Sequence, residues 1–458
     1  MDERALRDEA TELLRELIRI DTSNPPGGET PAAELLKAYL EDSGVECELV
    51  ARRADRANLV GRIRGSGEGP SLTLLGHTDV VPADASDWRH PPFEGHLDEE
   101  GYVWGRGAVD MKNEVATRAV AIAALARSGF RPRGDLVFLA VADEEDGLEE
   151  VGLSWLVRER PGIRTDYAIN EGAGERLVLA DGRVILTINV GEKATLRTLI
   201  TALGESGPSA LPDSGANAVP RLAELIRRLA DHRPVRRLLP ETETMLEALA
   251  GPVDGDLDAA LERTLALHPA LDELVTPLFG STVAPTRLQG STALNVMPAR
   301  ASVECDCRVL PGTREQDLRA ELESALRSDL RYELEFPDGV VGGSTSGTYT
   351  PLFDACRRFV ERNDPGAILV PTLCIGFTDS HYLRQAFGTV AYGFWPLRHT
   401  PYEVAVAGIH AHDERIHADD LGYTARFHVE LCRTIGASTT RPLRAGPRKA
   451  GSTPSPSP

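Results

Sequence analysis

Short apolar runs and a helical segment alternate along the first third of this chain. Residues 71–75 and 136–141 are runs typical of strands buried on both faces, and residues 115–127 between them form a helical segment that ends before Gly129. This alternation predicts an α/β domain, in which helices pack on both faces of a sheet. Ligands of such sheets bind beyond the carboxyl ends of the strands, so the loops after these runs are where function is expected.

The pattern changes after this region. Several strand-like runs, including residues 301–309, flank a helix with one apolar stripe. We therefore expect an inserted α+β domain at residues 189–313, within a discontinuous α/β domain made of residues 1–188 and 314–436. Residues 437–458 are mainly Pro, Ser, Thr, Gly and Arg, a composition that predicts a disordered tail.

Composition excludes several classes of function. The 458 residues include 50 Lys and Arg against 70 Asp and Glu, a formal charge of -20 that repels phosphate backbones and anionic lipids. The first residues are too charged for a secretory signal, so we expect a cytoplasmic protein with no nucleic-acid or membrane partner. The six cysteines form no C-x-x-C pair, which argues against a disulfide framework or a cysteine-based zinc site.

A histidine and two acids stand in the loops next to these elements. His77 and Asp79 come directly after the first apolar run, and Asp110 stands just ahead of the helical segment. A histidine at the rim of a sheet can bind a metal, and a carboxylate two residues away can orient its ring. The same residues also fit a hydrogen-bonded loop pair and an N-terminal helix cap. Their positions leave both interpretations open.

More acids follow the next apolar runs. Residues 143–147 read Asp-Glu-Glu-Asp-Gly, Glu171 follows residues 167–169, and His410 comes late in the chain, two residues before another histidine. Acids in a row are typical of a solvated surface, and two histidines this close can be incidental. Carboxylates delivered to the rim of a buried sheet together with imidazole nitrogens also suit zinc or a similar divalent ion.

Taken together, these segments resemble the di-zinc metallopeptidase and aminoacylase family. That family includes acetylornithine deacetylase, succinyl-diaminopimelate desuccinylase, aminoacylase, glutamate carboxypeptidase and carboxypeptidase-S-like dipeptidases. The similar segments run in order from the N-terminal helix to about residue 433. The resemblance implies a zinc-exopeptidase-like α/β/α catalytic domain, in which the α+β insertion is a lid and dimerisation domain.

The resemblance also implies a role for each candidate residue of the site. Two zinc ions would be bound, with cobalt or manganese as alternatives. One ion would be held by His77 and Glu171, the other by Glu145 and His410, and Asp110 would bridge them, while Asp79 would hydrogen-bond to His77 and Glu144 would be the general base.

Two of the three expected substrate contacts lie in the insertion. Asn295 and Arg308 match positions that contact substrate in the family, and Asn295 is expected to reach the site of a partner subunit. Thr378 lies in a loop, residues 376–380, that resembles a loop binding the substrate's carboxylate. Strand-end or turn hydrogen bonding is the alternative for each of them. The resemblance further implies a homodimer formed through the lid domain.

One position departs from the family's pattern. Residues 207–212 read Gly-Pro-Ser-Ala-Leu-Pro, so Pro208 stands where the family usually carries a lid histidine that donates to the developing oxyanion. Proline has neither a side-chain donor nor a backbone N–H. Losing one oxyanion donor lowers a rate on the order of a hundred- to a thousandfold. Three interpretations are open: another lid group substitutes, the true substrate needs less help, or hydrolysis of ordinary acyl-amino acids is slow.

The expected function is hydrolysis of an amide. We predict a di-zinc amidohydrolase that cleaves an N-acyl amino acid or a small peptide with a free carboxylate, using metal-activated water and Glu144 as the base. Pro208 motivates one alternative, a non-hydrolytic binding protein, and an enzyme that forms or exchanges amides is another. A dehydrogenase is not supported, because no G-x-G-x-x-G follows the first strands.

Overall fold

The computed structural model describes residues 2–147, 149–212 and 216–439. Most of the predicted disordered tail, residues 437–458, lies outside the described residues. The chain divides into two compact units, the first made of Met1–Asn189, Ser346–Val370 and the chain from Tyr382 onward, and the second of Val190–Thr345 and Pro371–His381. Both units combine helices with sheets, and the predicted α/β fold class is confirmed.

A nine-stranded sheet organises the first unit, with strand order β1-β2-β6-β3-β7-β19-β9-β18 and β8 paired to β9. The central strand β3 runs parallel to both of its neighbours, β6 and β7, and β7 runs parallel to β19. The strands are β1 (Glu46–Arg53), β2 (Arg56–Ile63), β3 (Leu72–His77), β6 (Leu136–Val141), β7 (Tyr167–Asn170), β8 (Arg176–Val178), β9 (Val184–Glu192), β18 (Ile368–Cys374) and β19 (Val390–Gly393).

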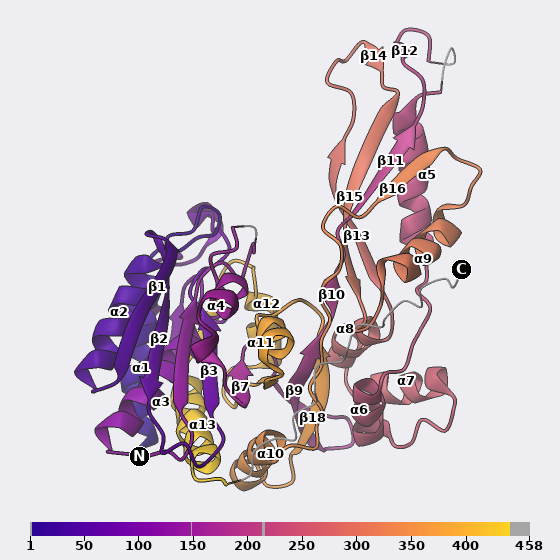
Figure 1. The fold of residues 1–458 in the computed structure, drawn as a ribbon. Helices are drawn as coiled ribbons and strands as arrows, with labels where there is room; N and C mark the ends of the chain where they lie inside the picture. The colour runs from indigo at the N-terminus through magenta and orange to yellow at the C-terminus, as the bar shows by residue number, and fades with distance from the viewer. Residues whose placement is uncertain (1, 148, 213–215, 440–458) are drawn as a thin grey trace, which may run out of the picture. The chain divides into compact units, whose positions relative to one another are not determined.

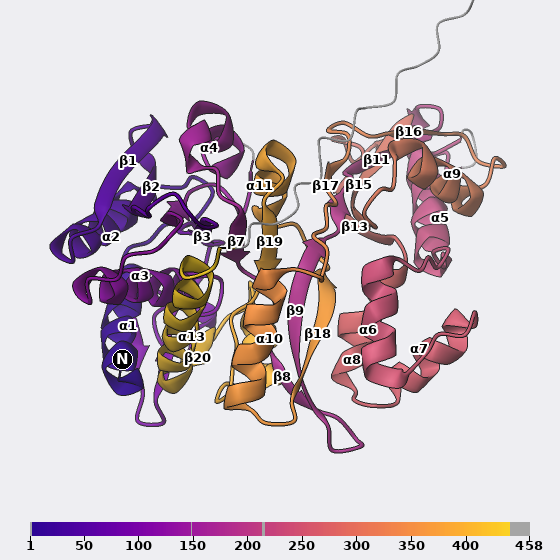
Figure 2. The same cartoon turned by 60° about the horizontal axis from the view of Figure 1, so that its bottom comes forward.

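Helices cover both faces of this sheet, which explains why β3 and β6 are buried along their whole length. Figure 2 shows α4 and α11 on one side of the strands and α1, α3 and α13 on the other. Because side chains alternate along a strand, Val137 and Leu139 pack towards α4. The helices are α1 (Glu3–Ile18), α2 (Thr30–Asp42), α3 (Lys112–Arg127), α4 (Leu153–Glu159), α10 (Pro351–Asn363), α11 (Ser380–Phe387), α12 (Tyr402–Gly408) and α13 (Ala418–Gly436).

A small antiparallel sheet brings together two distant parts of the first unit. Its strands are β4 (His96–Leu97), β5 (Tyr102–Trp104) and β20 (Arg415–His417), with β5 in the middle. The chain leaves β5 for the segment before α3, and it enters β20 from the segment after α12. These two segments therefore run beside each other.

The second unit is built on a six-stranded sheet, ordered β16-β11-β15-β10-β17 with β13 paired to β15, and a two-stranded sheet of β12 and β14. Helices α5 and α9 pack on one face of the larger sheet (Figure 1). The strands are β10 (Ala194–Thr195), β11 (Thr198–Leu203), β12 (Gly207–Pro208), β13 (Thr282–Gln289), β14 (Val296–Met297), β15 (Arg300–Val309), β16 (Tyr332–Glu335) and β17 (Val341–Gly342), and the helices are α5 (Ala218–Asp231), α6 (Pro240–Ala250), α7 (Leu257–Leu265), α8 (Ala270–Val275) and α9 (Glu315–Leu326).

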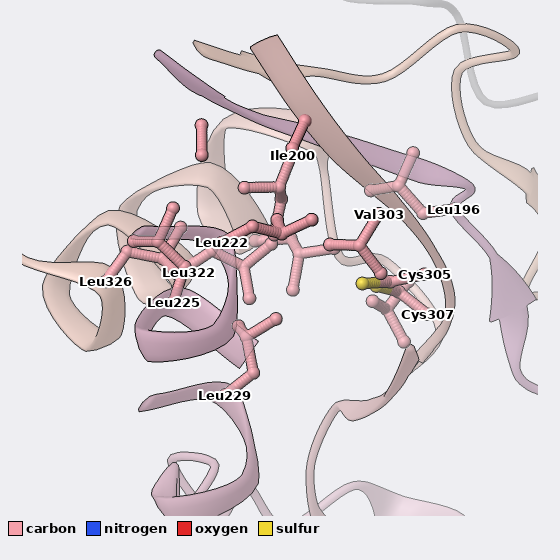
Figure 3. Packing of buried hydrophobic residues seen from close by; sticks show 14 of the residues in the cluster. Leu196, Ile200, Leu222, Leu225, Leu229, Val303, Cys305, Cys307, Leu322 and Leu326 are labelled. Carbon is pink, nitrogen blue, oxygen red and sulfur yellow. The ribbon is translucent and has the colours of Figure 1, made fainter. Parts of the chain in front are cut away.

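The core of the second unit lies between α5, α9 and the sheet. Figure 3 shows leucines of the two helices facing Val303, Cys305 and Cys307 of β15. The residues of β15 alternate between buried and partly exposed positions, as a strand with one covered face requires. The unit extends beyond residue 313, the end expected from the sequence, because β16 pairs with β11 and α9 contributes Leu318 and Leu322 to this core.

The sequence predicted no disulfide framework and no membrane partner, and the cysteines and helices of the structure relate to these two predictions. All six cysteines are free thiols, of which Cys305, Cys307, Cys356 and Cys432 are buried. Among the described residues, no helix has both the length and the apolar character needed to cross a bilayer.

Candidate active site

Three adjacent strands deliver polar side chains to the same edge of the large sheet. His77 is the last residue of β3, Glu144 and Glu145 follow β6, and Glu171 follows β7. Since β6, β3 and β7 are parallel neighbours, their carboxyl ends meet at this edge. Apolar residues buried on both faces fix the strands, so the polar residues after them are brought together by the sheet itself.

The His77 imidazole faces three carboxylates. Its Nε2 lies 3.2 Å from Asp110 Oδ1, 3.3 Å from Glu171 Oε2 and 4.0 Å from Glu144 Oε2. Burial alone would lower the pKa of His77. The charge of Glu171 and the hydrogen bonds that the imidazole donates to Asp110 and Glu171 outweigh this effect and raise that pKa well above its ordinary value. This is the electrostatic environment of a cation site.

Asp110 lies between two histidines. While its Oδ1 contacts His77, its Oδ2 lies 3.2 Å from Nε2 of His410, and the same nitrogen lies 3.0 Å from Glu145 Oε2. Burial works to raise the pKa of Asp110, but hydrogen bonds to the two histidines lower it well below its usual range. Hydrogen bonds to Asp110 and Glu145 raise the pKa of His410 to about 10. Burial and then the charge of Asp110 raise the pKa of Glu145 to about 7.

The chemistry of this donor set fits metal ions. Two groups have ligand atoms within 4.8 Å of one another: His77 with Glu144 and Glu171, and His77 with Asp110 and Glu145. Oε1 of Glu145 and Oε1 of Glu171 are buried and have no hydrogen-bond partner among the described residues. Leaving a buried carboxylate oxygen unpaired is unfavourable, and a divalent cation would satisfy both.

The carboxylate of Asp79 makes contacts that the sequence did not predict. Nδ1 of His77 hydrogen-bonds to the main-chain oxygen of Asp79 at 2.9 Å, whereas the Asp79 carboxylate is 3.6 Å away. That carboxylate accepts the backbone N–H groups of Glu144 at 3.2 Å and of Glu145 at 3.1 Å. Asn24 Nδ2 also donates to it, at 2.9 Å. Asp79 therefore holds the turn after β6 as well as contacting His77.

Sequence reasoning did not single out Asn24 as a site residue. It lies in the polar and proline-rich stretch that ends α1, 55 residues before its partner Asp79. Its backbone N–H also bonds to the carbonyl of Val80 at 2.8 Å, which fixes it beside the end of β3. The stretch resembles an ordinary helix stop, and no local signal distinguishes its asparagine from a turn residue.

A third group of potential ligands, His399, His417 and Asp419, has other roles in the structure. Nδ1 of His417 accepts the backbone N–H of Asp419 and so caps α13. Asp419 is paired with Arg7 at 3.1 Å. His412 is exposed. Nδ1 of His417 and the carboxylate of Asp419 therefore already have protein partners, in contrast to the buried oxygens around His77.

The predicted substrate-binding residues belong to the second unit. Asn295 is exposed in the turn before β14, and its carbonyl accepts the N–H of Ser209 at 3.1 Å. Arg308 in β15 forms an ion pair with Asp306 at 2.9 Å. Thr378 is buried, and its carbonyl accepts the N–H of His381 at 3.2 Å. Pro208 is exposed in β12, where it pairs with Val296 of β14.

Comparison with known proteins places the chain in a family. The family model for peptidase family M20/M25/M40 matches residues 73–434. Aminoacylase-1 of Mus musculus is 28% identical over 94% of this chain and 96% of its own length. Succinyl-diaminopimelate desuccinylase of Caulobacter sp. (strain K31) is 26% identical over 92% of this chain and 94% of its own length.

The fold agrees with this assignment. The crystal structure of an M20 family metallo-carboxypeptidase, Sso-CP2 from Sulfolobus solfataricus, superposes with a TM-score of 0.71 at 19% identity and covers 95% of this chain and 100% of its own. The chain therefore belongs to peptidase family M20/M25/M40, and it is a hydrolase that acts on amide bonds.

Proposed function

We propose that the protein is a di-metal amidohydrolase that cleaves an N-acyl amino acid or a small peptide with a free carboxylate. The observation that carries the proposal is the convergence of two imidazoles and four carboxylates at one edge of a buried sheet, with Asp110 within 3.2 Å of both imidazoles. The names of its relatives, an aminoacylase and a desuccinylase, support an acylated amino acid as the substrate class.

The metal ligands in this proposal follow the two sides of Asp110. His77 and Glu171 would hold one ion, Glu145 and His410 the other, and Asp110 would bind both; we propose zinc, with cobalt or manganese as alternatives. When bound, two such ions supply Lewis acidity, which polarises the amide carbonyl and lowers the pKa of water towards neutrality.

Glu144 is the proposed general base. Its carboxylate stands at the edge of the cluster, 4.0 Å from His77 Nε2, and its side chain is 10% exposed, so it can meet a water molecule entering the site. Glu144 would accept a proton from the attacking water and deliver it to the leaving amine. Asp79 keeps the base in place by accepting the backbone N–H groups of Glu144 and Glu145.

The remaining parts of the proposal concern the second unit. Arg308 would contact the substrate and Thr378 would bind its carboxylate. Asn295 would reach the site of a second copy of the chain, in a homodimer formed through this unit. In the described part of its sheet, β13 pairs only with β15, which leaves one edge for another strand. A cytoplasmic location is part of the same proposal.

Pro208 favours a second candidate, a protein that binds such ligands without hydrolysing them. It is exposed in β12 and offers no hydrogen-bond donor. Retention of Glu144 beside all five candidate ligands supports hydrolysis instead, because a binding protein has no use for a general base.

Metal analysis and a substrate panel test the proposal. We expect the zinc-loaded protein to contain two metal equivalents and to release free amine from at least one N-acetyl or N-succinyl amino acid or dipeptide, measured by mass spectrometry. Inactivity of the two-metal protein across the whole panel would contradict hydrolysis. Recovery of a tightly bound ligand unchanged after long incubation would then support the binding protein.

The variant Glu144→Gln provides the sharpest control. It keeps the size of the side chain but removes the proton acceptor, so kcat should fall on the order of a hundred- to ten-thousandfold. Metal content and thermal stability should stay at the wild-type level, because Glu144 is not among the five proposed ligands. Wild-type kcat in Glu144→Gln would rule out this residue as the base.

A further inference from the structure

Glu414 is a buried carboxylate that contacts the segment carrying Asp110. One oxygen, Oε1, accepts the backbone N–H groups of Val109 at 2.6 Å and Asp110 at 2.8 Å. The other, Oε2, accepts the N–H of Gly107 at 3.0 Å and Nη1 of Arg106 at 2.8 Å. Its side chain is fully buried, and all four donors come from residues more than 300 positions earlier in the chain.

The backbone of Glu414 binds the same segment. Its carbonyl accepts the N–H of Gly105 at 3.0 Å, and the next residues, β20, pair with β5. Glu414 also ends the segment that begins at His410. Glu414 therefore joins the two segments that bring Asp110 and His410 to the site. The side chains of Asp110 and His410 themselves contact each other through Oδ2 and Nε2.

The His410 segment depends on such support. His410 and Asp413 have φ values of 58° and 59°, a left-handed conformation that is unfavourable for residues with a Cβ and that persists where the surroundings impose it. The His410 side chain is 54% exposed, whereas that of His77 is 1% exposed. Burial therefore positions His77 on its strand, but it does little to position His410.

We propose that Glu414 is a positioning residue for the metal centre, and this inference rests on the proposed function. By hydrogen-bonding residues 105–110 to residues 410–414, it keeps Asp110 and His410 at a distance at which they can share a cation. The two metal positions then depend on it unequally. At the position of His77 and Glu171, only the shared ligand Asp110 depends on Glu414, because β3 and β7 place the other two ligands. At the position of Glu145 and His410, both Asp110 and His410 lie in the segments that Glu414 joins.

Glu414→Gln tests this inference with little change of volume. Each oxygen of Glu414 accepts two of the four hydrogen bonds. A glutamine has only one acceptor oxygen, and its NH₂ group would face two N–H donors. Two of the four hydrogen bonds are therefore lost, whichever way the amide is turned. Metal-free wild type and variant would each be titrated with Co²⁺ while the visible spectrum is followed, and Zn²⁺ affinities would be measured against a chelator. Replacing a residue that supports a metal ligand typically weakens metal affinity about 10- to 100-fold.

We expect Glu414→Gln to bind its first metal equivalent within about threefold of the wild-type affinity and its second about 10- to 100-fold more weakly. The spectral change of the second Co²⁺ equivalent should also be altered. Two equivalents bound with wild-type affinities and spectra would overturn the inference alone. Fewer than two equivalents in the wild type would overturn the di-metal proposal, and this inference with it.

Asp420 provides a matched control in the first unit of the chain. It is a buried carboxylate that accepts three backbone N–H groups, those of Arg398 at 2.7 Å, His399 at 2.9 Å and Thr400 at 2.6 Å. Asp420→Asn weakens the same kind of interaction, and none of these three donors lies in residues 105–110. It should lower the melting temperature of the metal-free protein while leaving both metal affinities unchanged. If it weakened the second equivalent as much as Glu414→Gln does, general destabilisation would explain both results and the inference would fail.

A second variant covers the case in which Glu414→Gln does not fold. Glu414→Asp keeps the charge and both oxygens but is one methylene shorter, so its hydrogen bonds to residues 107–110 are lengthened. Circular dichroism of the metal-free protein checks its fold. We expect its second metal affinity to lie between those of the wild type and a protein without this carboxylate, and a wild-type value would overturn the inference.

Discussion

Several side chains of this site are stabilised by one another instead of by solvent. In the metal-free protein the carboxylates of Asp110, Glu145 and Glu171 raise the pKa values of His77 and His410, so that imidazolium groups balance part of the negative charge. Such an arrangement contributes little to stability, because taking charges out of water offsets most of their attraction. In the proposed reaction its value is that an entering cation would find its ligands already gathered.

The buried His428 in α13 leads to a prediction about how the free energy of unfolding changes at acid pH. Its ring is fully buried, and neither nitrogen has a hydrogen-bond partner among the described residues. Burial, and then the nearby charge of Arg118, lowers the pKa of His428 well below its ordinary value. The unfolded chain takes up a proton here below about pH 6.5, while the folded chain does not until a much lower pH.

The stability that His428 provides by staying neutral is thus present above about pH 6.5 and is lost as the pH falls towards its folded pKa, by up to about 1.4 kcal/mol per pH unit. We expect His428→Leu to lose less stability than the wild type between pH 7.5 and 5.5, measured by urea unfolding of the metal-free protein. His412→Leu changes an exposed histidine and should follow the wild type. Equal pH slopes for His428→Leu and the wild type would show that His428 is protonated in the folded state.

Each element of the sheet has a structural part and a functional end. β3, β6 and β7 are buried along their length, and the residues at their carboxyl ends are candidate ligands and the proposed base. The strands that form the core are therefore the same ones that set the distances in the site. A substitution inside these strands should affect both stability and the metal centre.

Helix α5 allows a test of packing away from those strands. Leu225 is fully buried in the core of the second unit (Figure 3), whereas Val219 on the same helix is 45% exposed. Leu225→Ala should destabilise this unit by about 2–5 kcal/mol, because it leaves a cavity between α5, α9 and β15. Val219→Ala should change its stability by less than about 0.5 kcal/mol.

Hydrogen exchange followed by mass spectrometry can assign this loss to the second unit. Peptides from α5, α9 and β15 of Leu225→Ala should exchange faster than in the wild type, while peptides from β3 and α3 should keep their protection. Faster exchange of β3 and α3 to the same degree would mean that the two units unfold as one.

At the scale of the whole chain, the exposed edge of the second unit predicts association. Leu288 in β13 is 68% exposed and Leu294 in the following turn is fully exposed, beside a strand edge that the described sheet leaves unpaired. Exposed apolar side chains along such an edge favour pairing with another chain. Light scattering should therefore give twice the 49.5 kDa of one chain.

Leu288→Asp should shift this protein towards the monomer, because a dimer would bury the new charge. Val178→Asp introduces the same charge at a position of the first unit that is 52% exposed, and it should leave the mass unchanged. A wild-type mass equal to one chain, or a Leu288→Asp variant that stays dimeric, would rule out association through β13.

Much of the fold and of the candidate site follows from local patterns. The buried runs at β3 and β6 and the helix α3 were predicted from periodicity within ten or fifteen residues, and the acids and the histidine at their ends could be read directly. Pro208 is also recognisable from local sequence, because it interrupts a short motif at residues 207–212. In these cases the information lies in neighbouring residues, where side-chain spacing determines the secondary structure.

Long-range contacts account for the rest. Asn24 meets Asp79 across 55 positions, and Glu414 meets Asp110 across 304, so nothing near either residue in the chain reveals its partner. The second unit continues past residue 313 because β16 joins its sheet through pairing with the distant β11, which no local pattern reveals. The sequence by itself determined which elements form and which loops carry acids. Packing between distant segments decided which backbone N–H groups those acids accept. The physical reason is that a buried carboxylate is stable only where the folded chain supplies its hydrogen-bond donors.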